Sequence, residues 1–361
     1  MISPEQELDA HVRRIVGLHC SPETGTPYWI REAQRLGLRA RDGVVEGVDG
    51  FADLMRFPPF DKEQLRRAPH HDWIPRHRAG QPFHVFETGG TTGMPTQRIS
   101  WDDHKLDYSA FASRLDGVRA PSGEEAFPRG CAWLIVGPTG PRRLRLAMEH
   151  LAHARGGIAY HVDLDPRWVR RVLAQGDAAA AKAYQEHVID QAVTLLRHRE
   201  IGAVFTTPRL LEALGERVRL AERGVVGVLC GGTSMSPQTV RFLCEEVLEG
   251  RTRFVAVYGN TLMGLAASEP VGAHNGWEVI YHAPQPRAAL RVVDAAGVPV
   301  PYGERGQVEL STLTEEFFMP RLLERDEAIR RPPTADLPWD GTGDVRPLGT
   351  GAGKTTIEGV Y

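Results

Sequence analysis

Apolar and polar positions alternate in blocks from about residue 130 to residue 261. Short apolar runs that end in glycine or threonine, such as "VVGVLCGGTS", are typical of buried strands, and longer amphipathic runs are typical of helices. The expected strands lie in 130–140, 158–165, 202–208, 225–234 and 253–261, and the expected helices in 142–157, 181–199 and 237–249. Strands that alternate with helices predict an α/β fold whose mostly parallel sheet is covered on both faces.

Other patterns hold outside this block. The first eighty residues read as helices and loops, and Ser100 with Asp103 forms a capping-box-like start to a helix. Beyond residue 285, two β-like runs flank a turn around Ala295–Gly297, and 330–344 is a Pro/Gly-rich stretch that we expect to be an exposed loop. We therefore expect an α/β core of two subdomains in 1–285, a β subdomain in 286–345 and a short tail in 346–361.

Composition narrows the class of partner. The 361 residues carry a formal net charge of -3, which argues against a nucleic-acid surface. No apolar run approaches a membrane span, and the N-terminus is polar rather than a signal peptide. From this charge and the absence of an apolar span we expect neither nucleic-acid nor membrane partners. The four cysteines are scattered without a CxxC pair, so we expect a cytoplasmic protein without zinc or redox motifs. Of the 43 basic residues only four are lysines: Lys62, Lys105, Lys182 and Lys354.

The stretch "TGGTTGMPT", Thr88 to Thr96, holds three glycines and four threonines between two strand-like runs. Glycine lets another group approach the backbone closely, and the N–H groups of such a loop can converge on an anion. Threonine hydroxyls add neutral donors. A polyphosphate fits this description, whereas the plainer interpretation is a surface turn.

Four signals in one order resemble the large domain of the adenylate-forming superfamily, which includes acyl-CoA synthetases, firefly-type luciferases and peptide-synthetase adenylation domains. They are "TGGTTGMPT" (88–96), "GGTSMSP" (231–237), "YGNT" (258–261) and "TGD" (342–344). Thr96 and the stretch 302–328 are similar to the phenylacetate–CoA ligase branch. The size and the "YGNTLMG" variant look closest to compact adenylating enzymes of phenazine antibiotic pathways, such as the one that acts on griseoluteic acid.

The resemblance implies ATP and Mg²⁺ as cofactors and assigns a role to each matching residue. Thr88, Gly89, Gly90, Thr91, Thr92 and Gly93 would hold the β- and γ-phosphates. The adenine would lie against Gly231, Gly232, Thr233 and Tyr258, while Gly259, Asn260 and Thr261 approach the adenine and the α-phosphate. Asp344 would accept both ribose hydroxyls, and Thr92, Thr261 and Lys354 are the candidates for catalysis.

The implied reaction is attack of a carboxylate on the α-phosphate of ATP, which gives acyl-AMP and pyrophosphate. Two anions must meet, so the site has to supply positive charge and hydrogen-bond donors. His150, Gly232 and Tyr258 are the candidates for contact with the acid, and His153, Trp168 and Trp277 are further residues to watch. A histidine on a helix surface is the competing interpretation of His150.

The sequence departs from the family pattern in two places. The magnesium-binding glutamate expected after "YGxT" is Leu262, and Met263 is a poor magnesium ligand, which leaves Asn260 or Thr261 through water, or Glu269, as alternatives. The chain also ends soon after Asp344, where relatives carry a C-terminal domain with a catalytic lysine. Lys354 could supply that charge, although a solvated tail lysine is the plainer interpretation, and "GTGAGKTT" (349–356) lacks the glycine spacing of a Walker A loop.

Three functions remain open from the sequence. The leading hypothesis is an ATP-dependent adenylase for a carboxylic acid, an aromatic one in secondary metabolism. The second is an acyl-CoA or carrier-protein ligase whose C-terminal domain lies outside this chain, with CoA or a carrier protein as acceptor. The third is a catalytically degenerate nucleotide-binding protein, because the magnesium-binding glutamate is replaced by Leu262.

Overall fold

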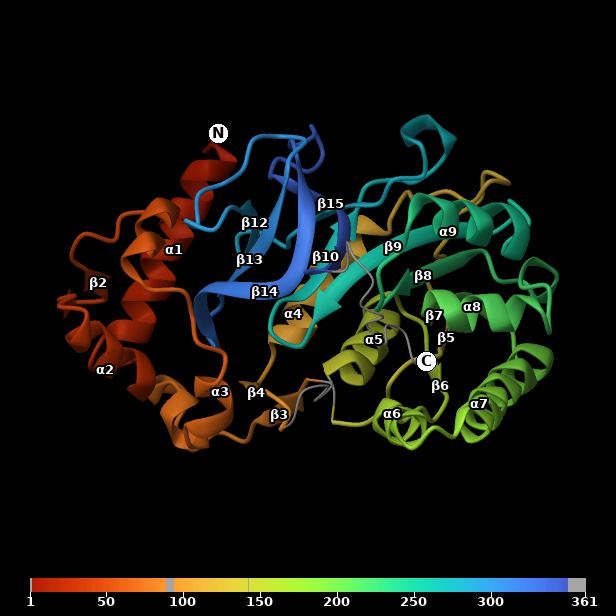
Figure 1. The fold of residues 1–361 in the computed structure, drawn as a ribbon, viewed down its shortest axis with the longest axis horizontal. Coiled ribbons are helices and arrows are strands. Elements are labelled where there is room, and N and C mark those ends of the chain that lie inside the picture. The colour runs from red at the N-terminus through yellow and green to blue at the C-terminus, as the bar shows by residue number, and fades with distance from the viewer. Residues whose placement is uncertain (1, 89–93, 142, 350–361) are drawn as a thin grey trace. The chain divides into compact units, whose positions relative to one another are not determined.

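The structure is a computed structural model that describes residues 2–88, 94–141 and 143–349 (Figure 1). The chain divides into two compact units. Unit 1 comprises Met1–Asp103, Asn260–Gly264 and His282–Thr342, and unit 2 comprises His104–Gly259, Leu265–Tyr281 and Gly343–Tyr361. The domain boundaries expected from the sequence stay a prediction.

Unit 1 combines an N-terminal helical part with antiparallel strands. Its helices are α1 (Pro4–Cys20), α2 (Pro27–Arg35) and α3 (Gln64–Arg67), with 3-10 turns at Phe51–Arg56, His70–Trp73 and Arg76–Arg78. Its strands are β1 (Ala40–Arg41), β2 (Val44–Val45), β3 (His84–Glu87), β4 (Gln97–Ser100), β12 (Ala288–Val293), β13 (Arg305–Leu313) and β14 (Phe318–Arg331). The expected helices and loops of the first eighty residues are thus confirmed, with the short β1–β2 hairpin added.

Helix α1 has a complete set of local signals. The Ser3 hydroxyl accepts the backbone N–H of Gln6, and the side-chain oxygen of Gln6 accepts the backbone N–H of Ser3. Pro4 occupies the first turn of the helix. The buried residues Leu8, Val12 and Ile15 recur at helical spacing and form the apolar face of the helix. This face lets the helix pack within unit 1.

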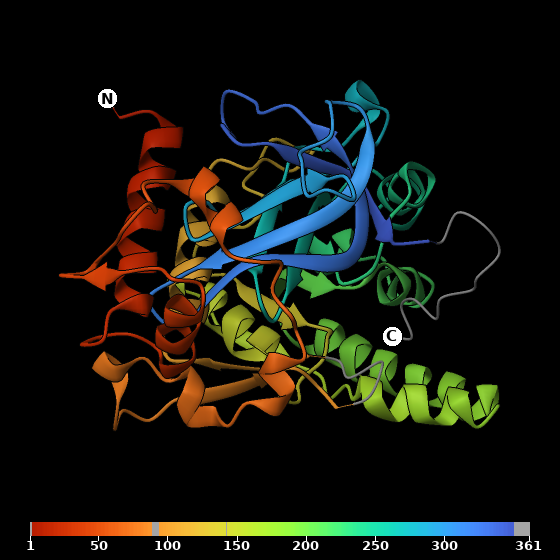
Figure 2. The same ribbon diagram turned by 60° about the vertical axis from the view of Figure 1, so that its left-hand side comes forward.

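Strands β12, β13 and β14 form consecutive antiparallel pairs (Figure 2). The turn after β12 is closed by the backbone N–H of Asp294, which donates to the carbonyl oxygen of Val298 at 2.9 Å. Gly297 has φ 78°, a conformation that favours glycine. The expected β-rich segment after residue 285 and its turn are therefore confirmed.

Unit 2 holds the alternating block. Its helices are α5 (Arg143–Ala154), α6 (Pro166–Ala174), α7 (Ala178–His198), α8 (Pro208–Gly215) and α9 (Pro237–Phe242), which continues as a π-turn over Leu243–Val247, and α4 (Asp103–Arg114) belongs to it from His104 onward. Its strands are β5 (Ala132–Ile135), β6 (Ala159–His161), β7 (Ile201–Thr206), β8 (Gly227–Gly231), β9 (Arg253–Asn260) and β10 (Gly264–Ser268). Strands β11 (Ile280–His282) and β15 (Gly341–Pro347) have residues in both units.

The strand order β9-β8-β7-β5-β6 is parallel at every step. Helices α5–α9 lie around these strands in Figure 1. The core contains Trp133, Ile135, Phe205 and Leu229 of the sheet, Tyr108 and Phe111 of α4, and Ala147, Met148 and Leu151 of α5. The predicted alternation of strands and helices in a parallel sheet is confirmed.

One local expectation was wrong and another was confirmed only in part. Ser100 does not cap α4, because its hydroxyl donates to Glu316, whose carboxylate accepts the N–H groups of that helix start instead. The exposed loop expected in 330–344 is shorter, because β14 runs to Arg331 and β15 begins at Gly341. The guanidinium of Arg330 joins the two strands' ends by donating to Asp340 at 2.8 Å, and the exposed residues between them are those of 332–338 apart from the buried Leu337.

No helix in the described ranges is both long enough and apolar enough to cross a membrane.

Candidate functional site

The stretch Thr88 to Thr96, called the Gly-Thr loop below, joins the antiparallel strands β3 and β4 of unit 1. Its ends are closed by Thr88 and Thr96, because the N–H of Thr88 donates to the carbonyl of Thr96 at 2.9 Å and the N–H of Thr96 donates to the Thr88 hydroxyl at 3.0 Å. The predicted residues Gly89, Gly90, Thr91, Thr92 and Gly93 lie outside the described residues. Within the described chain the buried Thr96 hydroxyl has no partner, so a polar atom at the base of this loop is left over for a ligand or water.

The "YGNT" motif runs from unit 2 into unit 1 at Asn260. The side-chain oxygen of Asn260 accepts the N–H groups of Leu262 at 2.9 Å and Met263 at 2.8 Å. The Thr261 hydroxyl donates to the carbonyl of Glu87 at 3.3 Å. Two of the predicted residues, Asn260 and Thr261, are therefore placed beside the strand that leads into the Gly-Thr loop.

Lys62 is a functional candidate that the sequence did not single out. The amide nitrogen of Asn260 donates to one oxygen of Glu324 at 3.1 Å, and the Lys62 ammonium lies 3.6 Å from the other oxygen. The side chain of Glu324 is 10% exposed and that of Lys62 is 26% exposed. The scarcity of lysines was the one signal that could have found it, because four positions are few enough to test each.

The segment after Lys62 also contacts the Gly-Thr loop. Arg66 on α3 donates from Nε to the carbonyl of Met94 at 2.8 Å, and the same guanidinium is paired with Glu63. In unit 1, Arg66 and Thr261 thus contact the described ends of the loop, and Lys62 is linked to Asn260 through Glu324. The phosphate role expected for the loop stays a prediction, and Arg66 is the cation in contact with its described part.

The contacts of Asn260 make it a poor candidate for holding Mg²⁺, which was one of the alternatives in the sequence analysis. An amide oxygen has two lone pairs, and the oxygen of Asn260 already accepts two backbone N–H groups. Leu262 and Met263 are 1% and 2% exposed and belong to the apolar interior. No group of three or more His, Cys, Asp or Glu residues suited to a metal ion occurs among the described residues. Glu324 is the carboxylate in contact with the motif, so any Mg²⁺ held here by the protein would draw on that residue and on substrate oxygens.

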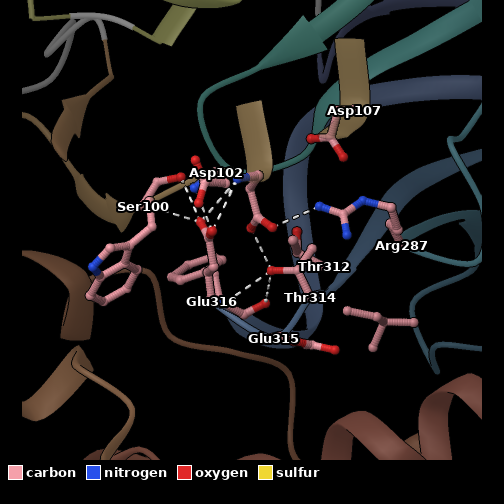
Figure 3. Close-up of polar contacts among 12 residues, drawn as sticks. Ser100, Asp102, Asp107, Arg287, Thr312, Thr314, Glu315 and Glu316 are labelled. Atoms are coloured by element: carbon pink, nitrogen blue, oxygen red, sulfur yellow. Dashed lines mark hydrogen bonds and ion pairs between the residues drawn. The ribbon is translucent and has the colours of Figure 1, made fainter. Parts of the chain in front are cut away.

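Unit 1 also contains a buried charged network (Figure 3). Asp103 is 1% exposed and accepts from Arg98, from Arg287 at 2.7 Å and from the Thr314 hydroxyl. Arg98, also 1% exposed, donates to the carbonyl of Leu262 at 2.6 Å. The network therefore fixes β4 against the chain that carries Asn260.

Glu316 completes the network from the hairpin between β13 and β14. Its carboxylate accepts the Ser100 hydroxyl at 2.9 Å and the backbone N–H groups of Trp101 at 2.8 Å, Asp102 and Asp103 (Figure 3). These backbone groups lead into the N-terminus of α4, where an anion is favoured electrostatically. Glu316 thus supplies the N-terminal cap that Ser100 was expected to provide.

In unit 2, the glycine at the end of β8 has no room for a side chain. A Cβ at Gly231 would lie 2.3 Å from the carbonyl oxygen of Val257, and Gly232 has φ 95°. Thr233 follows and is half-buried. The end of this strand therefore presents backbone at the position predicted for adenine, and only glycine fits its geometry.

Tyr258 lies on the neighbouring strand β9. Its ring is half-buried and sits 5.4 Å from the ring of Tyr281 at an interplanar angle of 37°. Burial raises the pKa of Tyr281, which keeps its phenol neutral. Gly259 is exposed. Unit 2 therefore brings an aromatic ring and a bare glycine to adjacent positions.

Asp344 lies within β15 rather than in a loop. It has φ 44°, which is uncommon for a residue with a side chain, and its carboxylate is 4.0 Å from the guanidinium of Arg346. Strained backbone conformations gather at functional sites. The structure thus adds a backbone feature to the ribose role that the sequence motif suggested.

The acid-contact candidates are spread over unit 2. His150 on α5 shares a 2.8 Å hydrogen bond with the Ser109 hydroxyl, and its partial burial lowers its pKa, with Lys105 and His153 lowering it further. His153 is exposed, and Trp168 is 46% exposed with Arg171 over its ring. Trp277 has φ 65°. Lys354 lies outside the described residues.

Comparison with known proteins gives a structural likeness only. No protein-family model matches the chain, and no curated protein matches it. A crystal structure of 2-hydroxyisobutyryl-CoA ligase with 2-HIB-AMP and CoA in the thioesterification state is similar at a TM-score of 0.70 and 16% identity, over 96% of this chain and 68% of that one. The same ligase in an open conformation gives a TM-score of 0.65 at 15% identity, over 97% and 71% of the two chains.

At such identities the likeness shows the fold. The α/β fold predicted from the sequence is confirmed, and it is the fold that this chain shares with that ligase. The finer resemblances to phenylacetate–CoA ligases and to phenazine enzymes are not among these findings.

Proposed function

We propose that this protein activates a carboxylic acid by adenylation, with attack of the carboxylate on the α-phosphate of ATP and release of pyrophosphate. The observation that carries the proposal is the cluster in unit 1, where the ends of the Gly-Thr loop, Asn260, Thr261 and Lys62 are joined by hydrogen bonds and an ion pair. Its fold is shared with a ligase crystallised with an acyl-AMP.

The phosphates would be held from unit 1. Backbone N–H groups of the loop and the hydroxyls of Thr88, Thr91, Thr92 and Thr96 provide donors, and Lys62 provides a charge. The ion pair with Glu324 fixes the Lys62 ammonium beside Asn260 while leaving its other donors for a phosphate oxygen. Such preorganised charge lowers the barrier to a reaction between two anions.

The nucleoside would use residues of unit 2. The bare backbone at Gly231 and Gly232 suits close approach of a planar base, Tyr258 offers a ring for stacking, and the Asp344 carboxylate can accept two ribose hydroxyls. Mg²⁺, when bound, neutralises phosphate charge and orients the leaving pyrophosphate. Glu324 is the carboxylate of this chain that we assign to it.

The finer parts of the proposal are the acid and the acceptor. We propose an aromatic acid of secondary metabolism on the resemblance to phenazine-pathway adenylating enzymes, and CoA or a carrier protein as the acceptor. The structurally similar ligase was crystallised with CoA, which favours CoA as the first acceptor to test. Thr96 and the stretch 302–328 support the phenylacetate–CoA ligase-like assignment.

The test is ATP binding and pyrophosphate release by Lys62→Met, with Lys182→Met as the matched control. Lys182 is 78% exposed and lies on α7, so its loss should change neither quantity. Loss of the Lys62 charge should cost about 3 kcal/mol of barrier, or roughly a hundredfold in rate. An unchanged rate in Lys62→Met would remove Lys62 from the site.

A nucleotide-binding protein without catalysis is the second candidate, because Leu262 stands where relatives carry the magnesium-binding glutamate. Tight ATP binding with no acid-dependent pyrophosphate release would favour it.

A further inference from the structure

A buried polar cluster between α4 and α5 of unit 2 has no role in the nucleotide contacts proposed above. Arg143, the first residue of α5, is 4% exposed, and its Nη2 donates to Oδ2 of Asp107 on α4. Asp107 and the adjacent Tyr108 are each 4% exposed. Burial raises the pKa of Tyr108 to about 12, and the charges of Arg143 and Asp107 both act on its phenol.

The cluster has more donors than acceptors. A guanidinium carries five N–H donors and no acceptor, and the phenol of Tyr108 adds one more donor. Nε and Nη1 of Arg143 are buried and have no hydrogen-bond partner anywhere in the described ranges. Unpartnered buried donors are rare in native proteins and call for a ligand, an ion or an ordered water. Because the unused groups belong to a cation, their complement is an oxyanion.

The cluster lies at the ligand-binding edge of the parallel sheet. Helix α5 begins just after the loop that follows β5, and at the start of that loop the N–H of Val136 donates to the carbonyl of Phe205 on β7 at 2.8 Å. In open α/β sheets, ligands bind outside the carboxyl ends of the strands. Arg143 is therefore at the end of the sheet where an acid would enter.

The same pair of helices carries the acid-contact candidate His150. Arg143, Ala147 and His150 recur on α5 at helical spacing, and both polar members pair with α4, Arg143 with Asp107 and His150 with Ser109. The buried faces of the two helices, with Phe111 on α4 and Met148 and Leu151 on α5, belong to the core of unit 2. A ligand that reaches both pairs would present a polar group to each of them.

We propose that Arg143, held by Asp107, binds an oxyanion of the acid substrate, namely a second carboxylate in addition to the one that is activated. This inference rests on the proposed function, because it assigns a group to the acid of that reaction. Nη1 would donate to an oxygen of the second carboxylate and Tyr108 would add its hydroxyl, while Nε, whose N–H lies on another edge of the guanidinium, would donate to a separate acceptor. Asp107 positions the guanidinium and makes no contact with the acid.

The first experiment measures binding without ATP, so that it does not depend on catalysis. Succinate and butyrate differ by one carboxylate in place of a methyl group, and isophthalate and benzoate make an aromatic pair. Thermal shift titrations of the full chain should give a Kd at least tenfold lower for one of the two dianions than for its monoanion partner. Equal affinities within both pairs would overturn the proposal.

The variant is chosen so that no buried charge is left without its ion-pair partner. Arg143→Gln alone would remove the ion-pair partner of the buried Asp107, so the test uses Arg143→Gln together with Asp107→Asn. Arg145→Gln is the control, because Arg145 is on the same helix, 47% exposed and paired only weakly with Glu149 at 3.9 Å. The double variant should lose the preference for the dianion, and the control should keep it. Retention of the preference in the double variant would overturn the proposal, provided that its thermal unfolding remains cooperative.

A conservative variant separates binding from folding. Arg143→Lys keeps the charge beside Asp107 but lacks the planar fork, so the dianion preference should fall about tenfold while the unfolding temperature changes little. An unchanged preference in this variant would contradict a contact through Nη1 of the guanidinium.

Inorganic phosphate distinguishes the source of the oxyanion. One outcome would be that inorganic phosphate competes with the dianion for the unmodified chain, while the double variant binds dianion and monoanion equally with or without phosphate. In that case the cluster accepts phosphate groups of the nucleotide or CoA, and the assignment to the acid is wrong. Absence of pyrophosphate release with every acid, together with a retained dianion preference in binding, would reject the proposed function and leave this binding site standing.

Discussion

The two units hold their candidate residues in different ways. In unit 1 the residues beside the Gly-Thr loop are fixed by buried side-chain charges, as in the pairing of Asp103 with Arg98 and Arg287. In unit 2 the corresponding residues are fixed by the backbone, through the closed approach at Gly231 and the left-handed φ of Asp344. Unit 1 should therefore respond to changes of charge and pH, and unit 2 to changes of volume and backbone conformation.

The largest effect should come from Asp103→Ala. The change leaves the guanidinium of Arg98, which is fully buried, without its carboxylate. Removal of one partner of a buried pair costs about 3–5 kcal/mol of unfolding free energy. Urea denaturation measures this. Arg241→Gln is the control, since its pair with Glu245 is exposed and should give no measurable change. A cost below about 1 kcal/mol for Asp103→Ala would show that the network does not stabilise unit 1.

The pH dependence of unit 1 should follow His19. Burial lowers the pKa of His19 to about 4, and its ring nitrogens lie 2.6 Å from the Thr26 hydroxyl and 2.8 Å from the carbonyl of Thr314. The unfolded chain binds the proton more tightly than the folded one. The contribution is therefore present above about pH 6.5 and is lost as the pH falls toward 4, by about 3 kcal/mol.

The check on His19 is urea denaturation at pH 7 and pH 4.5 for the unmodified chain and for His19→Gln. The loss of stability between the two pH values should be smaller in the variant, because an amide does not titrate. Equal losses would mean that other groups account for the acid sensitivity of the protein.

Asp344→Ala tests the candidate residues of unit 2 by their effect on nucleotide binding. Nucleotide affinity should weaken by about 1.5–3 kcal/mol, the scale of hydrogen bonds to a charged group. Isothermal titration with ATP measures it. The 2′,3′-dideoxy analogue should bind the unmodified chain as weakly as ATP binds the variant. Equal affinity of the unmodified chain for ATP and the analogue would contradict the ribose role.

Gly231→Ala should give the smallest effect of the four. The added methyl would lie 2.3 Å from the carbonyl oxygen of Val257, so the strand ends must shift, at a cost of about 1–3 kcal/mol. Gly140→Ala is the control, because no atom of the described residues lies within 4 Å of its added Cβ. If Gly231→Ala unfolds like the control, the backbone at this strand end is less constrained than its geometry indicates.

The sequence predicted most of unit 2, because its elements follow local rules. The apolar run before Gly231, the proline at the first turn of α9 and the glycine stop after α5 are each visible within a few residues. The order of the glycine-rich motifs then sufficed for the fold.

The contacts missed from the sequence join residues far apart in the chain. Nothing near Lys62 indicates that Glu324 will hold it beside Asn260, and nothing near Ser100 indicates that Glu316 will accept its hydroxyl. Periodicity describes which face of an element is buried, whereas these pairs depend on how β14 and the β13–β14 turn fold back on the N-terminal region. Charge networks of this kind are therefore found in the structure first.

The central claim is tested most directly by acid-dependent exchange of labelled pyrophosphate into ATP. Reversible formation of an acyl-AMP requires exchange that appears only when protein, ATP, Mg²⁺ and a suitable acid are all present. We predict such exchange with at least one aromatic acid of a panel that includes dicarboxylic members, and a large reduction in Lys62→Met but not in Lys182→Met. ATP binding without exchange for any acid would contradict adenylation and leave a nucleotide-binding protein.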